Sequence, residues 1–327
     1  MPVRVAIVGC GGVAHAHLAG WEKLPTVEFV AMCDTIKEKA DQYAEARKCA
    51  AYYDVATMLK EAKPDLVDVC TREPHHDTPT IEVLEAGVPC MVEKPMFGAK
   101  DQYNICAADV PHAQAMVAAS RQSGAALFMN FNYRFSPYGI QLKELIDSGE
   151  MGEPAYMHCV THLACWSHTI DLIRFFNGDV VELAARVSGP ENEQTRSASL
   201  RFANGSVGTL LGTTQRGWQH DLLRLEYAGT KGYAVMRDIA GGLEYYPGGR
   251  RERVYTMTCH DGPRSEFQIT FDGSMAAFAA FVGEGKPTTA ATGLDGLREL
   301  EVDAGIFVAA ERGEWLNLRD EFGDVPA

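Results

Sequence analysis

The stretch VRVAIVGCGGVA, residues 3–14, decides the fold of this chain. Its apolar first half, Val3–Val8, predicts a buried strand that stops at GCGGVA, a G-x-G-x-x-A pattern. A helical pattern follows over about Val13–Leu24, so the glycines lie at a strand-to-helix turn, where exposed backbone amides can bind a pyrophosphate. The alternative is that the glycines only form a turn. The strand before them and the helix after them favour a dinucleotide site.

Each residue of the glycine turn has a physical role in such a site. Gly9 permits the tight turn, Gly11 lets the backbone approach the phosphates, and Ala14 is small enough for the helix to pack closely on the sheet. Gly12 and Val13 complete the expected cofactor-binding loop.

A carboxylate supplies a second signal for the same cofactor. The run Glu28–Cys33 predicts another buried strand, and it ends at Asp34, about twenty residues past the turn, where a carboxylate can accept both ribose hydroxyls. Thr35 follows it and joins the expected cofactor residues. An aspartate here repels a ribose phosphate and so favours NAD, whereas Lys37 and Lys39 nearby leave NADP open.

Composition narrows the class of protein. A chain of 327 residues, 46% of them apolar, exceeds what one hydrophobic core usually supports, so we expect two domains. The net charge of −14, without a basic stripe, argues against nucleic acid as a partner. No apolar run approaches the roughly 20 residues that span a bilayer, and the opening run is too short for a signal peptide, so we expect no membrane association and a cytoplasmic location.

The cysteines and histidines do not suggest a metal site. The nine cysteines contain no C-x-x-C pair and read as small buried hydrophobes in a reducing compartment, for example Cys33, Cys70 and Cys106. Cys10 and Cys165 remain alternatives as catalytic thiols near the cofactor. The pair His158 and His162 lies on a predicted strand without acidic or thiolate partners, so we expect packed or solvated imidazoles and no metal.

Short apolar runs alternate with helical stretches in the first part of the chain. Such alternation predicts right-handed βαβ units on a doubly wound parallel sheet, a Rossmann domain that we place at residues 1–124. Ligands gather at the carboxyl ends of parallel strands, where Gly9, Asp34, Thr71 and Lys94 should converge. The expected elements are strands at 3–8, 28–33, 66–70 and 88–92, helices at 37–47, 54–61, 78–86 and 111–123, and a last strand at 126–131.

The pattern changes in the rest of the chain, residues 125–327. Runs of period two at 180–187, 197–202, 206–213 and 222–227, with a hairpin signal at Asn204-Gly205 and a turn at 229–232, predict a large, mostly antiparallel sheet backed by helices. A short helix is expected at His168–Phe176. Two late helices, near 274–282 and 294–312, precede a terminal strand around 315–318.

Four motifs in this order resemble those of the glucose–fructose oxidoreductase / inositol dehydrogenase / rhizopine catabolism family, called Gfo/Idh/MocA. They are GCGGVA at 9–14, Glu93-Lys94-Pro95, Asn132-Tyr133-Arg134-Phe135 and His168-Thr169-Ile170-Asp171. The resemblance covers nearly the whole chain. It implies an NAD(P)-dependent oxidoreductase that transfers hydride between nicotinamide and a secondary alcohol or ketone of a sugar, cyclitol or glycoside.

The resemblance also implies roles for individual residues. Lys94 would polarise the reacting oxygen, and His168 would act as acid/base, because imidazole titrates near neutrality. The alternatives are an exposed lysine before a proline and a capping or core histidine. Further expected cofactor contacts are Thr71, His76, Glu93 and Lys94 itself, and a cis peptide is implied before Pro95. The expected substrate contacts are Tyr133, Arg134, Trp166 and Asp171. Tyr133 and Arg134 could instead lie at the contact between the two domains. Asp171 could instead orient the His168 ring or lie on the helix surface.

The chain departs from the family pattern in several places. Ala164 stands four residues before His168, where the family's dehydrogenases usually carry an aspartate. Arg72 and Glu73 replace the usual Pro-Asn of the cofactor loop. The segment Thr161–Ser167 is short, which predicts a more open pocket, and Met96–Asp109 is about ten residues longer than expected and predicts an added loop at the pocket entrance.

A second class of function stays open: a non-catalytic dinucleotide-binding sensor or repressor on the same fold, which Ala164 favours and Lys94 with His168 disfavours. Hydride chemistry on an imine or a linear tetrapyrrole is a third possibility that no residue singles out. The resemblance further implies a homodimer or homotetramer formed through the C-terminal sheet.

Overall fold

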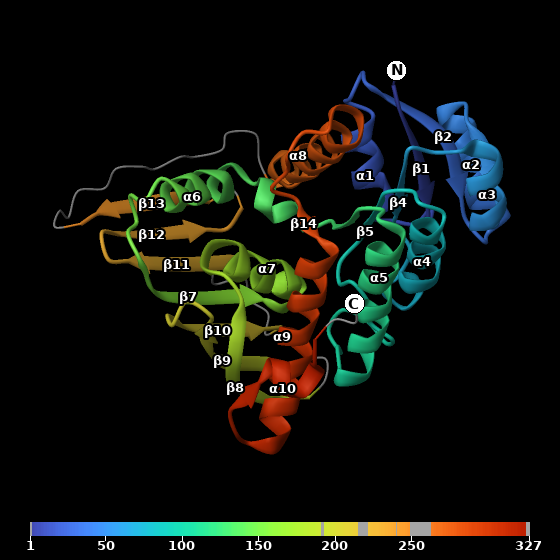
Figure 1. The fold of residues 1–327 in the computed structure, drawn as a ribbon. Coiled ribbons are helices and arrows are strands. Elements are labelled where there is room, and N and C mark those ends of the chain that lie inside the picture. The colour runs from blue at the N-terminus through green and yellow to red at the C-terminus, as the bar shows by residue number, and fades with distance from the viewer. Residues whose placement is uncertain (1, 191–192, 215–221, 240, 249–262, 325–327) are drawn as a thin grey trace.

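The chain folds into two sheets that lie side by side and are flanked by helices (Figure 1). The computed structural model describes residues 2–190, 193–214, 222–239, 241–248 and 263–324. The predicted fold class, a Rossmann domain followed by a mostly antiparallel sheet with helices, is confirmed.

The first sheet has the strand order β14-β6-β5-β4-β1-β2-β3. All its pairings are parallel except β14 with β6. Because β1 lies at the centre and the chain winds outward from it in both directions, the carboxyl ends of β1, β4 and β5 meet at one edge. The strands are β1 Val3–Val8, β2 Val27–Cys33, β3 Ala50–Tyr52, β4 Leu66–Val69, β5 Cys90–Val92, β6 Leu127–Met129 and β14 Ala291–Thr292.

Helices cover both faces of this sheet. They are α1 Ala14–Trp21, α2 Lys37–Arg47, α3 Val55–Ala62, α4 Asp77–Glu85 and α5 Val110–Ser123, with the short 3-10 turns η1 Glu73–His75 and η2 Ala107–Asp109. Two late helices return to the same domain: α8 Pro263–Glu284 packs on α1, and α9 Gly293–Arg312 packs on α5 and also on the second sheet. The first domain is thus completed by the end of the chain.

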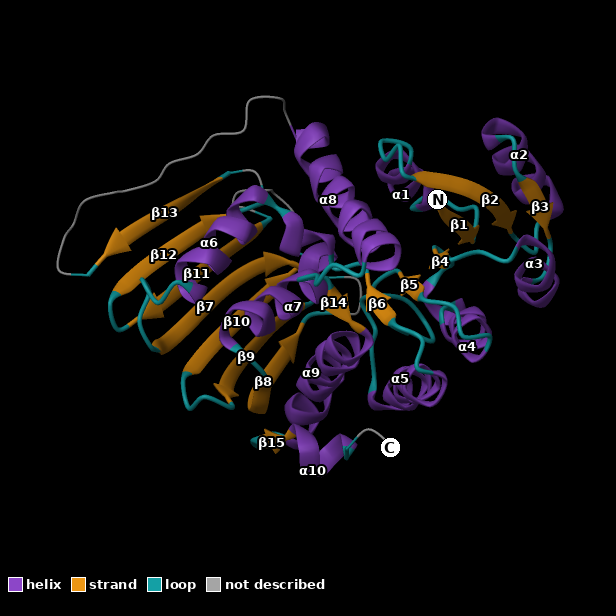
Figure 2. Ribbon diagram, turned by 45° about the horizontal axis from the view of Figure 1, so that its top comes forward, coloured by secondary structure: helices purple, strands orange, loops and turns teal. Residues whose placement is uncertain are grey.

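The second sheet has the order β13-β12-β11-β7-β10-β9-β8-β15 and fans out beside the first domain (Figure 2). Its pairings are antiparallel except β7 with β10. The strands are β7 Pro154–His162, β8 Val180–Ser188, β9 Thr195–Phe202, β10 Val207–Thr213, β11 Leu223–Gly229, β12 Gly232–Arg237, β13 Gly242–Pro247 and β15 Leu316–Asn317. The helical elements are η3 Asn132–Phe135, α6 Pro137–Asp147, η4 Leu163–Cys165, α7 Trp166–Asn177 and α10 Leu318–Phe322.

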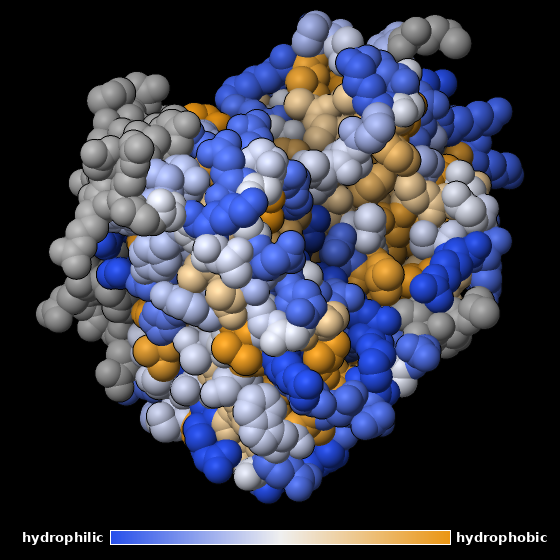
Figure 3. Space-filling model, turned by 60° about the vertical axis from the view of Figure 1, so that its left-hand side comes forward, coloured by the Kyte–Doolittle hydropathy of each residue, from blue (hydrophilic) through white to orange (hydrophobic). Residues whose placement is uncertain are grey.

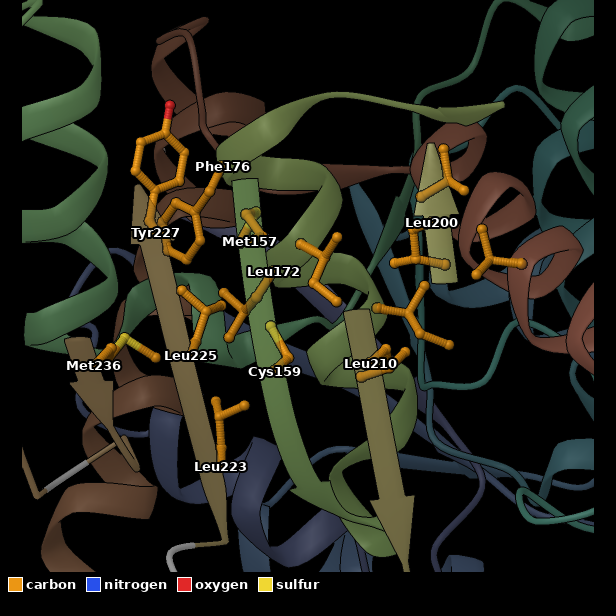
Figure 4. Close-up of a cluster of buried hydrophobic side chains, with 14 of the residues drawn as sticks. Met157, Cys159, Leu172, Phe176, Leu200, Leu210, Leu223, Leu225, Tyr227 and Met236 are labelled. Atoms are coloured by element: carbon orange, nitrogen blue, oxygen red, sulfur yellow. The ribbon is translucent and has the colours of Figure 1, made fainter. Parts of the chain in front are cut away.

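Alternation along the strands gives the second sheet one buried face. In β10 every second residue is buried, and Leu210 is 1% exposed whereas Val207 is 55% exposed. Figure 4 shows such inward side chains from neighbouring strands, including Cys159, Leu210 and Leu225, on the same side as Leu172 of α7. The helix α7 is therefore surrounded by protein, and nearly all of its residues are buried.

Several elements differ from the sequence prediction. The strands β3, β13 and β14 and the helix α10 were not predicted. β3 and β14 are only three and two residues long and pair with strands further away in the sequence, whereas β13 forms a hairpin with the preceding strand β12. The helix predicted at 274–282 is longer and begins at Pro263. Strand β6 pairs with β5, so the first sheet includes residues that follow position 124.

Most of the described cysteines are buried, but Cys106, which was expected to be buried, is exposed on the loop that leads into η2. The peptide between Lys94 and Pro95 is cis, as expected. None of the described helices is long and apolar enough to cross a membrane. Hydrophobic residues form separate orange patches among polar residues on the face drawn in Figure 3.

We predict that Gly9→Ala destabilises the first domain strongly. Gly9 has φ +94°, and an added Cβ would lie 2.7 Å from the backbone of Cys70 and Thr71, so both strain and a clash result. Urea unfolding should show a loss of at least about 2 kcal/mol. Gly124→Ala is the matched control: its φ is +74° with nothing within 4 Å of the added Cβ, so it should lose only about 1 kcal/mol. Equal losses would contradict the clash.

Candidate active site

The glycine turn leaves open space on its outer side. Gly9 is required by the protein's own packing, whereas an added Cβ at Gly11 or Gly12 would meet nothing within 4 Å. Helix α1 begins just after them at Ala14, and no side chain caps that end. Backbone amides at the positive end of a helix dipole therefore border an open space, which suits a phosphate group.

A first cavity of about 570 Å³ lies beside this turn, and Asp34 and Thr35 are part of its lining. The Asp34 carboxylate accepts hydrogen bonds from the Cys10 and Ile36 amides, both at 2.8 Å, so it is held against the turn. Asp54 and Glu82 line the same cavity and make it acidic.

A second cavity of about 320 Å³ connects the glycine turn to the ends of β4 and β5. The imidazole of His76 lies between two carbonyl oxygens, that of Pro95 at 2.9 Å from Nδ1 and that of Thr71 at 3.0 Å from Nε2. This contact joins the loop after β4 to the loop after β5. The lining of this second cavity includes Gly11, Gly12, Val13, Thr71, His76, Glu93, Lys94 and Gln102.

A third cavity of about 500 Å³ holds the predicted chemistry-bearing pair. Lys94, from the end of β5, and His168, from α7, both line it, so residues from the two domains meet as expected. Its lining also includes Val13, Glu93, Asn132, Tyr133, Ala164, Cys165, Asp238 and Phe271. Lys94, Glu93 and Val13 border both the second and the third cavity.

The His168 ring is fixed by aromatic packing. It stacks on Tyr133 with ring centroids 4.0 Å apart and planes 12° apart, and Phe131 meets it edge-on. Burial, helped by the nearby charge of Lys94, lowers the pKa of His168 to about 3, so the imidazole is neutral at neutral pH. Its Nδ1 atom has no hydrogen-bond partner among the described residues.

Lys94 has a partner that was not predicted. Its Nζ donates to Oε1 of Gln102 at 2.6 Å. Gln102 belongs to the long segment that follows Pro95, which was expected to line the pocket entrance. The only sequence feature that pointed to this contact was the unusual length of the segment, and length alone does not identify Gln102 as the partner of Lys94.

Glu93 is engaged by a buried polar network below the cavity. His17 on α1 bonds to Glu93 through Nε2 and to Asp68 of β4 through Nδ1, both at 2.8 Å. Asn130 donates to Glu93 at 2.5 Å and accepts from Ser274 of α8 at 2.8 Å. The network therefore joins α1, β4, β5 and α8 under the Lys94 backbone.

The buried network contains ionised side chains. Burial alone would lower the pKa of His17, but the charge of Asp68 outweighs it and raises that pKa well above its usual value. Burial opposes ionisation of Glu93 too, yet its hydrogen bond and charge interaction with His17, with help from Lys94, bring the pKa of Glu93 down to about 2. An imidazolium thus lies between two carboxylates.

His17, Asp68 and Cys70 also have the proximity of metal ligands. Their atoms already satisfy one another: Asp68 accepts from His17 and from Trp21, each at 2.8 Å, and from Cys70 Sγ at 3.5 Å. Hydrogen bonds explain this cluster without an ion.

Three residues expected to contact substrate are instead turned into the protein. Arg134 and Asp171 form a two-point ion pair at 2.6 and 2.8 Å, both buried. The Asp171 carboxylate is therefore not on the helix surface, and it is occupied by Arg134 rather than by the His168 ring. Trp166 donates through its indole nitrogen to Asp303 at 2.8 Å. These contacts hold η3, α7 and α9 together and so fix where His168 lies.

Ala164 does border the third cavity, and the position of the usual aspartate is thus apolar. A carboxylate reaches the cavity from elsewhere: Asp238 follows β12, has φ +58°, and accepts from the Ile239 amide at 2.8 Å. No motif in the sequence marks Asp238.

Cys165 also lines the third cavity, and burial raises the pKa of its thiol, which disfavours a reactive thiolate. Burial likewise raises the pKa of Cys10 to about 12.

His158 and His162 are engaged in the protein's own contacts. His158 Nδ1 lies 2.6 Å from the Thr209 hydroxyl, and His162 Nδ1 accepts from the Ala164 amide at 3.1 Å.

Two family models match this chain. One, described as an oxidoreductase family with an NAD-binding Rossmann fold, matches residues 3–131, and the other, the GFO/IDH/MocA C-terminal domain, matches residues 161–235. Among curated relatives, D-apiose dehydrogenase of Paraburkholderia graminis is 25% identical, with 98% of this chain and 91% of that protein covered. D-Glucoside 3-dehydrogenase of Escherichia coli is 34% identical over 46% of this chain and 41% of its own length.

Solved structures share the fold. An oxidoreductase from Agrobacterium radiobacter in complex with NAD+, L-tartaric acid and magnesium has a TM-score of 0.83 at 18% identity, with 98% of this chain and 99% of that chain covered. Levoglucosan dehydrogenase in complex with NADH has a TM-score of 0.82 at 17% identity, with coverage of 97% and 99%.

We predict that His17→Gln destabilises the protein and changes its pH dependence. A raised pKa means that the charged His17 stabilises the fold fully below about pH 6.5, and that this stabilisation is lost as pH rises through the raised pKa. The wild type should therefore lose stability in alkaline solution. The variant leaves two buried carboxylates without their cation and should lose about 3 kcal/mol near pH 7.

Melting temperatures between pH 6 and 10 measure both effects. His15→Gln is the control, since His15 lies on the same helix but bonds to Tyr43 at the half-buried surface. A His17→Gln protein as stable as the control, with an unchanged alkaline slope, would refute the buried imidazolium.

Proposed function

Because the chain belongs to the Gfo/Idh/MocA family of oxidoreductases, we propose that it is an NAD-dependent dehydrogenase acting on a secondary alcohol or ketone of a sugar, cyclitol or glycoside. The observation that carries this proposal is that Lys94 and His168, from different domains, line one cavity that continues to the glycine turn through Val13 and Glu93. The names of the relatives, D-apiose and D-glucoside 3-dehydrogenase, support the substrate class.

The residues present fit a dinucleotide. The open space beside Gly11 and Gly12 would accept the pyrophosphate, and the fixed carboxylate of Asp34 would accept the ribose hydroxyls. Thr71, His76 and Glu93 surround the path from there to Lys94. When bound, the nicotinamide supplies a carbon that accepts or donates hydride.

The charges around Asp34 support NAD over NADP. A phosphate on the ribose would meet the carboxylates of Asp34, Asp54 and Glu82, which line one cavity. Lys37, whose ammonium lies over the Tyr53 ring at 4.8 Å from the centroid, supplies one positive charge near this cavity and so offsets the three carboxylates only in part.

Lys94 and His168 divide the work on the substrate oxygen. The ammonium of Lys94 donates to that oxygen and stabilises the negative charge that develops as the hydroxyl proton leaves and the carbon loses hydride. The neutral imidazole of His168 accepts that proton in oxidation, and its protonated form returns it in reduction. Tyr133 keeps the ring in place by stacking.

Arg134, Asp171 and Trp166 act as positioning residues in this proposal. Arg134 on η3 binds Asp171 on α7, and Trp166 on α7 donates to Asp303 on α9. Their effect on substrate is therefore indirect, through the placement of α7.

The pairing of Lys94 with His168 argues against the alternative of a cofactor sensor. A protein that only senses the cofactor needs neither a cation nor a base in the cavity that these two residues line.

We further propose that the outer face of the second sheet mediates a homodimer or homotetramer. Tyr156, Val207 and Leu211 are exposed there at 44%, 55% and 37%, which is unusual for large apolar side chains on adjacent strands. A cytoplasmic location is proposed from the free cysteines among the described residues.

We predict that Lys94→Ala lowers kcat by about 100- to 1,000-fold while NADH still binds with nearly unchanged affinity, because the ammonium acts on the reacting oxygen. Absorbance at the reduced nicotinamide band, with NAD and a panel of polyols and glycosides, measures turnover, and NADH fluorescence measures binding. Lys60→Ala, at an exposed position on α3, is the control. Normal turnover of Lys94→Ala would reject the proposed mechanism.

We predict that Asp34→Ala weakens NAD binding by about tenfold or more and narrows the preference for NAD over NADP, since ribose hydroxyls lose their acceptor and a ribose phosphate loses a repelling charge. Calorimetric titration with both cofactors measures the change. Glu45→Ala, exposed on the neighbouring α2, should leave both affinities as they are. An unchanged ratio of the two affinities in Asp34→Ala would exclude the ribose assignment.

A further inference from the structure

The segment from Met96 to Asp109 crosses from the end of β5 to α5 and carries Gln102 to the cavity edge. We refer to residues 96–109 as the strap. Apart from η2 it has no regular structure, yet it is held by its own side chains. Asp101 Oδ1 accepts from the Tyr103 amide and from Asn104 Nδ2, both at 2.8 Å. Asp109 accepts from the Ala99 and Cys106 amides at 3.0 and 2.8 Å.

The strap is also fastened to the second domain. Arg196 of β9, fully buried, donates to the carbonyl oxygen of Tyr103, the residue next to Gln102. Arg196 is itself held by Asp303 at 3.3 Å and by Gln194 at 3.1 Å. The Tyr103 ring packs against the core of the second sheet. The position of Gln102 is therefore set by both domains together.

Gln102 meets Lys94 with a neutral acceptor. Its amide oxygen takes one of the three ammonium hydrogens at 2.6 Å and leaves the other two for other acceptors. A carboxylate at the same place would bind the ammonium as an ion pair and compete with a substrate oxygen, whereas an amide orients the lysine without cancelling its charge.

We propose that Gln102 is a positioning residue that aims Lys94 at the reacting oxygen and preserves its positive charge. The consequence for turnover rests on the proposed function, but the contact itself does not. Lys94 is therefore placed correctly only when Arg196 holds the strap against the second domain.

The test uses the 327-residue chain without cofactor or substrate. Trinitrobenzenesulfonate labels lysines as free amines, and mass spectrometry of peptides gives the labelling rate of Lys94 alone. Gln102→Met keeps the length of the side chain but removes the acceptor, so Lys94 should react about threefold faster or more. Gln102→Glu adds a charged acceptor, so Lys94 should react more slowly than in the wild type.

Opposite directions are the signature of a direct contact, because mere disruption of the strap would expose Lys94 in both variants. Asn104→Leu is the matched control: it removes a bond within the strap and should leave the Lys94 rate unchanged. Exposed Lys60 serves as the internal standard in every sample. Labelling that shifts in the same direction in Gln102→Met and Gln102→Glu, or in neither, would overturn the inference.

Turnover supplies a second, separate readout. With NAD and the polyol and glycoside panel, Gln102→Met should lower kcat about tenfold with an unchanged KM for NAD. A loss expressed only in the KM for NAD would count against positioning. If the wild type is inactive on the whole panel while labelling follows the expected order, the proposed function fails and the contact between Gln102 and Lys94 stands.

Discussion

The site depends on one buried cation, His17, between the carboxylates of Asp68 and Glu93. Its helix begins directly after the glycine turn, its first partner lies on β4, and its second partner immediately precedes Lys94. Two buried carboxylates without a cation would destabilise the fold by several kcal/mol. The charged imidazole must therefore stay between them, and this requirement couples the position of the glycine turn to that of Lys94. Because Ser274 of α8 joins through Asn130, the last part of the chain closes the same network.

Much of this site follows from topology and could be predicted. A residue just after a strand of a parallel sheet lies at the carboxyl edge whatever the side-chain packing, which is why Gly9, Asp34, Thr71 and Lys94 converge as expected. The hairpin turn that contains Asn204 and Gly205, with Gly205 at φ +87°, and the alternation in β10 are local signals of the same kind.

Other residues could not be placed from sequence, because their surroundings come from distant parts of the chain. Helical spacing puts His168 and Asp171 one turn apart, but it does not say that Arg134 reaches Asp171 from η3. Trp166 reads equally well as a pocket residue and as a core residue until Asp303 of α9 is in place. Gln102 and Asp238 belong to no motif, since one lies on a loop of irregular backbone and the other at the end of a strand whose partner was not predicted.

The neutral state of His168 follows from the same surroundings and bears on how the site works. Ala164 lines the same cavity and aromatic rings lie on two sides of the His168 ring, and burial together with the charge of Lys94 disfavours an imidazolium more than the charge of Glu93 favours it. In the proposed function, a proton that His168 takes from substrate is therefore held weakly and is passed on readily. In that proposal Lys94 chiefly stabilises the negative charge that develops on the substrate oxygen. The orientation of Lys94 therefore matters more here than in a site where a carboxylate supports the histidine. Retention of a neutral partner on Lys94, rather than an anionic one, is consistent with that demand.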